Sequence, residues 1–281
     1  MQESEVFKRQ GFAHIKGLLS ADEVAHYKAL LQKISGLTDY NFDFKHAVSG
    51  YSMADGIVQF KEFWPLIYHE KLIRNLQVLM HRQPRFVQHA DLHVHHGGVG
   101  WHRDNAYRTF MKGPDWDESK EEYSIVRVAI YLQSSRESHF KMGVIPGSHR
   151  RESFLNRLEM NGGRIYGRLT RNLPPFYLTV KPLWIPLEPG DCLIFDQRLL
   201  HTGTHIRGPK YSMYLGYGAD DVHSRNHLDY YHSQKEMGYS SFPEALARIL
   251  SQKLLLPDFI YKKFGLIDLE KTDRGYVKTL S

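Results

Sequence analysis

The residues best suited to chemistry lie in the segment WHRDN, which contains His102 and Asp104. Side chains two positions apart on an extended segment point the same way, so this imidazole and this carboxylate can reach one metal ion together. A third ligand must come from elsewhere in the chain. His201 is the best candidate because it follows the strand-like segment GDCLIFDQ. His205 is the alternative, but it lies four residues further on, in a predicted loop.

Two histidines and one carboxylate suit iron(II), because they occupy one face of an octahedron and leave the opposite face open for a 2-oxoacid and O₂. A closed structural zinc site needs four protein ligands, usually including cysteine, and Cys192 is the single cysteine of this chain. A His-x-Asp pair alone is weak evidence in a chain with 17 histidines. The order of the motifs supports the metal site, because the pair follows an early strand and His201 follows a late one.

Four segments resemble the phytanoyl-CoA dioxygenase (PhyH-like) family of Fe(II)/2-oxoglutarate-dependent oxygenases. They are FKRQGFAHIKGLLSADEV at 7–24, WHRDNAY at 101–107, MGVIPGSH at 142–149 and GDCLIFDQRLLHTG at 190–203. The resemblance implies a double-stranded β-helix core with His102, Asp104 and His201 as iron ligands. It also implies 2-oxoglutarate as co-substrate, release of succinate and CO₂, and a structural role for His149 in the PGSH turn.

The expected site for 2-oxoglutarate departs from the family pattern. Family members usually place an arginine after the distal histidine, on the last core strand, and Lys210 occupies that position here, with Ser212 on the same face. A lysine neutralises a carboxylate as a point charge, without the planar fork of arginine. Arg207 is the nearby alternative. Arg127, in the middle of an apolar strand, can face the same cavity or be an arginine paired inside the barrel.

Three further histidines, His93, His95 and His96, precede the ligand pair. Their simplest interpretation is as surface residues or as residues that support the ligands. His95 and His96 also lie close enough to the ligand loop to reach the co-substrate, so we include His95 among the candidate 2-oxoglutarate contacts.

The expected reaction is hydroxylation of an unactivated C–H bond in a small metabolite. Asp104 favours this outcome, because the halogenases related to this family lack the carboxylate; desaturation, epoxidation and ring closure use the same oxidant. Tyr107 and Trp116, in the loop after the ligand pair, are candidate substrate contacts or ordinary packing residues. A cupin-like metalloenzyme, either an isomerase or a 2-oxoglutarate-independent dioxygenase, is the alternative function, since it needs no basic anchor.

Short strands between helical flanks must position these residues. Segments rich in β-branched and aromatic residues, separated by Gly and Pro, occur at 86–94, 124–133, 142–147, 176–180, 192–196 and 211–218. They predict a mainly β fold with a double-stranded β-helix (jelly roll, cupin-like) core over roughly 85–220, within one domain covering 1–281. A strand at 12–15 and helices after Ser20, over 62–81 and over 243–264 are expected around it, and 220–232 is expected to be solvated surface.

Composition narrows the class of partner. The chain is 42% hydrophobic and 24% charged, and its formal charge of +6 is spread among acidic residues, which is typical of a solvated globular surface. It contains no basic helix, zinc finger or RNA-binding motif, so no nucleic-acid partner is expected. The N-terminal segment lacks a signal sequence, and no apolar run has the length of a membrane span. We therefore expect a cytoplasmic enzyme whose partners are a small-molecule substrate, O₂ and 2-oxoglutarate.

Overall fold

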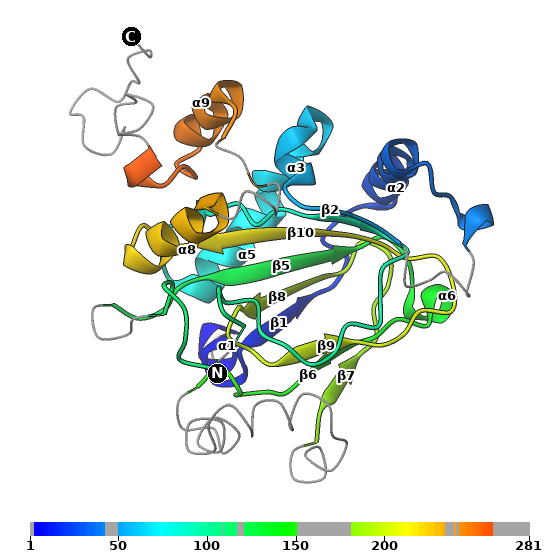
Figure 1. Ribbon diagram of the computed structural model, residues 1–281, viewed down its shortest axis with the longest axis horizontal. Coiled ribbons are helices and arrows are strands. Elements are labelled where there is room, and N and C mark those ends of the chain that lie inside the picture. Colours follow the sequence, from blue (N-terminus) through cyan, green and yellow to red (C-terminus); the bar gives the residue numbers. More distant parts are fainter. Residues whose placement is uncertain are drawn as a thin grey trace.

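Two antiparallel sheets form the core (Figure 1). The computed structural model describes residues 3–42, 50–108, 110–116, 121–150, 181–233, 239 and 242–260. The large sheet has the order β1-β8-β5-β10-β4-β2, with β3 paired to β10, and the small sheet has the order β7-β6-β9. The strands are β1 (Phe12–Ile15), β2 (Tyr51–Met53), β3 (Arg85–Phe86), β4 (Leu92–Val94), β5 (Val126–Tyr131), β6 (Met142–Val144), β7 (Leu183–Ile185), β8 (Cys192–Asp196), β9 (His201–Gly203) and β10 (Tyr211–Gly218). This is the predicted double-stranded β-helix, and β1 and β2 extend its large sheet beyond the predicted 85–220 core.

The large sheet is covered on both faces, which explains why its central strand is an almost continuous apolar run. Every residue of β5 is buried. Val128 and Ile130 belong to the core under the helices, whereas Ala129 and Tyr131 belong to the core between the two sheets. Because side chains alternate along a strand, β5 contributes to two separate cores.

Most helices lie on the outer face of the large sheet, away from the small sheet (Figure 1). The helices of the described residues are α1 (Glu3–Gln10), α2 (Ala21–Ser35), η1 (Asp39–Asn41), α3 (Gly56–Gln59), η3 (Lys61–Phe63), α4 (Trp64–Ile67), α5 (Glu70–Met80), α6 (Ser135–Ser138), α8 (Val222–Ser233) and α9 (Glu244–Gln252). Ser20 and Glu23 form a capping box at the start of α2, where a helix was expected after Ser20. Within the described ranges, no helix is both long enough and apolar enough to cross a membrane.

Three predicted elements differ from the structure. The helix expected over 62–81 is divided into η3, α4 and α5, because Pro65 lies in the first turn of α4 and His69 caps a new helix, α5. The segment expected as surface at 220–232 forms α8, whose His223, His227 and Tyr231 are buried. The predicted strand at 176–180, and the predicted helix beyond residue 260, lie outside the described residues.

The strand expected over 86–94 is interrupted between β3 and β4. Gln88 and His89 have left-handed backbone conformations, with φ of 61° and 49°. The Gln88 carbonyl accepts a hydrogen bond from the backbone N–H of Gly216 at 2.8 Å, and its side chain donates to Asp55 at 2.7 Å. Hydrogen bonds to Gly216 and to Asp55 therefore fix this bulge, and the bulge directs His89 toward the space between the sheets.

We predict that Gly216→Ala lowers the free energy of unfolding by about 1–3 kcal/mol, because added volume forces the packed backbone apart. A Cβ at this position would lie 2.7 Å from the Gln88 carbonyl oxygen and 3.3 Å from the Cβ of His89. Urea unfolding followed by circular dichroism measures the effect. Gly100→Ala is the control, since a Cβ there meets nothing within 4 Å. Equal losses in the two variants would contradict close packing at the bulge.

Candidate functional site

The structure brings His102, Asp104 and His201 together between the two sheets. Their potential ligand atoms all lie within 4.8 Å of one another, and no other such group occurs among the described residues. His102 Nε2 lies 3.5 Å from Asp104 Oδ1, and His201 Nε2 lies 3.7 Å from Asp104 Oδ2. His205, the alternative third ligand, is exposed and stands outside the group.

Backbone hydrogen bonds place these three side chains. The N–H and C=O groups of His102 and His201 bond to each other at 2.9 and 3.0 Å, and the Asp104 N–H donates to the Gln197 carbonyl at 2.8 Å. The Nδ1 atom of His102 donates to the Gly100 carbonyl at 2.7 Å, and that of His201 to the Leu199 carbonyl at 2.9 Å. Both imidazoles therefore present Nε2 to the shared space, which is the orientation that a metal ligand needs.

The protonation states in this group also suit a divalent cation. Burial lowers the pKa of His201 to about 4, so its ring is neutral at pH 7. Burial alone would raise the pKa of Asp104, but His201, His102 and Arg127 together hold it well below its usual value. The group therefore offers the neutral imidazole of His201 and the ionised carboxylate of Asp104, the forms that bind metal.

Arg127 connects Asp104 to a second buried acid. Its Nε lies 3.7 Å from Asp104 Oδ2, its Nη2 lies 2.5 Å from Asp91 Oδ2, and its Nη1 donates to the His89 carbonyl. The Tyr239 hydroxyl donates to the other oxygen of Asp91 at 2.6 Å. The guanidinium is thus engaged beside the ligands, which agrees with our alternative interpretation of an arginine paired inside the barrel.

Lys210 is a buried cation in the same cavity. Its Nζ donates to Ser212 Oγ at 2.7 Å and lies 4.6 Å from the centre of the Phe140 ring, with Tyr131 and Tyr214 slightly further away. Burial lowers the pKa of this amine, and within the described part of the chain no carboxylate pairs with it. A buried ammonium without an acidic partner is costly, so the position is suited to an anionic ligand.

The cavity that contains the three candidate ligands and Lys210 has a volume of about 380 Å³. Three histidines complete its polar wall: His89, His93 and His96. His93 lies opposite Ser212 in the β4–β10 register, so alternation along the strand could have identified it. No sequence pattern could have identified His89 or Tyr239. His89 reaches the cavity only because of the bulge at Gln88 and His89, and Tyr239 lies beyond α8, outside any predicted strand.

The remaining candidates lie elsewhere. His95 has a φ of 56°, so strand alternation ends at Val94, and the His95 ring instead packs against Tyr211 and bonds to the Thr38 carbonyl. Arg207 is exposed, and Tyr107 is 57% exposed beside Tyr230. Trp116 is buried between Phe110 and Tyr123. None of these four candidates lines the cavity, so we carry none of them into the proposal below.

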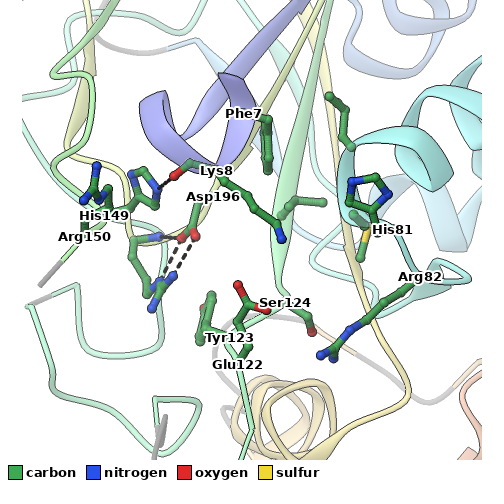
Figure 2. Close-up of a pocket in the computed structure, with 14 residues that line it drawn as sticks. Phe7, Lys8, His81, Arg82, Glu122, Tyr123, Ser124, His149, Arg150 and Asp196 are labelled. Carbon is green, nitrogen blue, oxygen red and sulfur yellow. Dashed lines mark hydrogen bonds and ion pairs between the residues drawn. The ribbon is translucent and has the colours of Figure 1, made fainter. Parts of the chain in front are cut away.

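His149 lies at a second cavity, between α1 and the end of α5 (Figure 2). Its Nε2 donates to the Lys8 carbonyl at 2.9 Å, and the neighbouring Ser148 Oγ accepts from the Leu200 N–H at 2.8 Å. The PGSH turn therefore ties α1 to the chain just before His201. These contacts agree with the structural role expected for His149.

Comparisons with known proteins agree with the fold and the expected family. The sequence matches the phytanoyl-CoA dioxygenase (PhyH) family over residues 7–212, and no curated protein matches it. The solved carbocyclase SnoK from nogalamycin biosynthesis, described as non-heme and alpha-ketoglutarate dependent, is 18% identical, with a TM-score of 0.56 over 78% of this chain and 83% of that one. HygX from Streptomyces hygroscopicus, solved with nickel and 2-oxoglutarate, is 17% identical, with a TM-score of 0.55 over 78% and 87%. EctD from S. alaskensis is 18% identical, with a TM-score of 0.54 over 78% and 76%.

A double-stranded β-helix with two histidines and one aspartate facing its interior defines the class of mononuclear non-haem metal enzymes. Within that class, this chain belongs to the phytanoyl-CoA dioxygenase family of iron(II)/2-oxoglutarate-dependent oxygenases. The solved structures, at these identities, support the shared fold.

We predict that Arg127→Leu lowers the free energy of unfolding by about 3–5 kcal/mol, because it leaves buried carboxylates without their cation. Chemical denaturation of the metal-free protein measures this. The double variant Arg127→Leu/Asp91→Leu should recover part of the loss, since one of the two stranded charges is removed. Simple additivity of the two single losses would contradict the ion pair between these residues.

Proposed function

We propose that this chain is an iron(II)/2-oxoglutarate-dependent oxygenase in which His102, Asp104 and His201 hold iron and Lys210 holds the far carboxylate of 2-oxoglutarate. One observation carries the proposal: the Lys210 amine is buried in the same cavity as the three metal-binding side chains, and its partners among the described residues are the hydroxyl groups of Ser212 and Tyr214, not a carboxylate. A metal site alone is compatible with many reactions. A metal site with a buried cation in the same cavity is suited to a co-substrate with one acidic end at the metal and the other at the cation.

The donor set fits iron(II). Three protein ligands of nitrogen and oxygen type leave coordination positions for a bidentate 2-oxoacid and O₂, and no fourth histidine, cysteine or acid joins the group among the described residues. Iron and 2-oxoglutarate, when bound together, supply with O₂ an oxidant able to remove hydrogen from an unactivated C–H bond.

The protein's own residues position the candidate ligands and exclude water from the charged groups of the cavity. Arg127, which is paired with Asp91, helps to keep the Asp104 carboxylate ionised and in place, and the Phe195 ring packs against His201 at 4.7 Å between centres. At the other end, Lys210 neutralises a carboxylate, and Ser212 Oγ, which accepts from Lys210, keeps its own hydrogen for a carboxylate oxygen. The rings of Phe140 and Tyr131 exclude water from that charge pair, which strengthens it.

Hydroxylation of a small metabolite is the reaction that we propose, and Asp104 supports it by occupying the coordination position that halogenation would need. The solved structures of this fold include proteins described as an epimerase and a carbocyclase. A succinate-release assay across a metabolite panel, with mass spectrometry of the consumed compound, tests the outcome. The gain of one oxygen atom supports hydroxylation, and an unchanged mass or the loss of two hydrogens contradicts it.

We predict that anaerobic addition of iron(II) and 2-oxoglutarate to the metal-free protein produces a visible charge-transfer band. The band requires the 2-oxoacid to chelate the metal, so His201→Ala should abolish it while leaving the fold intact by circular dichroism. Bound iron without such a band in the unmodified protein would favour a metalloenzyme that does not use 2-oxoglutarate.

Lys210→Met should weaken 2-oxoglutarate binding at least about tenfold, because removing one partner of a buried charge pair costs about 2–5 kcal/mol. Titration of the charge-transfer band measures this affinity, and metal binding should be unchanged. Arg207→Met is the matched control, since this nearby cation is exposed and lies outside the cavity. A larger effect at Arg207 than at Lys210 would show that the anchor has been assigned to the wrong residue.

A further inference from the structure

Buried hydrogen bonds connect helix α8 to the segment that contains Asp104. The His227 Nδ1 atom lies 3.1 Å from Asp115 Oδ2, and both side chains are fully buried. Asp115 also accepts hydrogen bonds from the backbone N–H of Ala106, at 3.0 and 3.2 Å to its two oxygens. Asp115 therefore joins α8 to the chain just two residues after a candidate metal ligand.

Two further contacts connect α8 to the segment around Asp104. The Asn226 side chain donates to the Pro114 carbonyl at 2.8 Å, and the Tyr231 hydroxyl lies 3.5 Å from the Asp104 carbonyl. The rings of His227 and Tyr231 are 4.6 Å apart, and Tyr231 in turn stacks on His89 at 4.2 Å. The segment around Asp104 thus lies between Gln197, to which its backbone bonds, and α8.

Helix α8 lies outside the part of the chain that matches the family. The match ends at residue 212, and α8 begins at Val222. The family pattern alone therefore assigns no role to α8. The buried contacts of α8 reach the metal segment through the backbone of Ala106, so movement of α8 would move Asp104.

We propose that His227, through Asp115, is a positioning residue that holds the Asp104 segment in its metal-binding geometry. The inference rests on the proposed function, because it assumes that Asp104 is a metal ligand. His227 contacts no ligand side chain, and it acts by fixing the Asp115 carboxylate that accepts the Ala106 N–H. Loss of this hydrogen bond removes the shortest contact that holds the backbone of the Asp104 segment on the α8 side, and leaves the longer contact of Tyr231 with the Asp104 carbonyl.

Cobalt(II) titration of the metal-free protein tests the proposal, with the visible d–d spectrum reporting ligand geometry. His227→Phe should weaken cobalt(II) binding at least about tenfold and alter the spectrum, as loss of groups that orient metal ligands typically does. His227→Asn keeps a nitrogen donor near the Nδ1 position and should restore most of the affinity. Should His227→Phe fail to fold, Asp115→Leu, which has a similar size but no acceptor for the Ala106 N–H, provides the same test.

His223→Phe is the matched control, because His223 is also fully buried on α8 but packs against Tyr123. It should bind cobalt(II) as the unmodified protein does, whatever its effect on stability. Unchanged affinity and spectrum in folded His227→Phe, or an equal loss in His223→Phe, overturns the proposal while leaving the proposed function intact. Failure of the unmodified protein to bind cobalt(II) overturns the proposed function itself.

Discussion

Two reciprocal backbone hydrogen bonds between His102 and His201 are the contact on which the site depends. They fix two segments that are distant in the sequence, and the bond from Asp104 to Gln197 extends the same contact. The imidazoles are then oriented by carbonyl groups of these segments themselves. The convergence of the three side chains is therefore a property of the backbone, and each side chain needs little freedom to reach the shared point.

The buried charges follow a simple pattern around this frame. At one end of the cavity, Arg127 lies between the carboxylates of Asp91 and Asp104, so one negative charge is left over for a bound cation. At the other end, Lys210 has aromatic rings and Ser212 around it but no carboxylate among the described residues. The cavity therefore has a surplus of negative charge beside the metal ligands and a buried amine without a carboxylate at Lys210.

The sequence predicted those features that depend on local pattern. Alternation along a strand placed Lys210 and Ser212 on one face, and the structure joins them by a hydrogen bond. His95 was a candidate because it lies close to the ligand loop in the sequence, but a positive φ at this residue ends the strand at Val94, and its ring packs against Tyr211 instead. The burial of α8 could not be predicted, since its polar residues are satisfied by partners such as Asp115, far away in the chain. Contacts of this kind leave no periodic signal in the sequence.

The choice of lysine at position 210 has a consequence for selectivity. A guanidinium accepts a carboxylate in one plane and by two parallel hydrogen bonds, whereas an ammonium imposes no plane. With Phe140, Tyr131 and Tyr214 forming walls around the amine, the depth of the pocket remains as the discriminating quantity. In the proposed binding mode, the distance between the metal ligands and Lys210 selects the length of the 2-oxoacid, and a 2-oxoacid one carbon shorter or longer leaves one of its two ends without its partner.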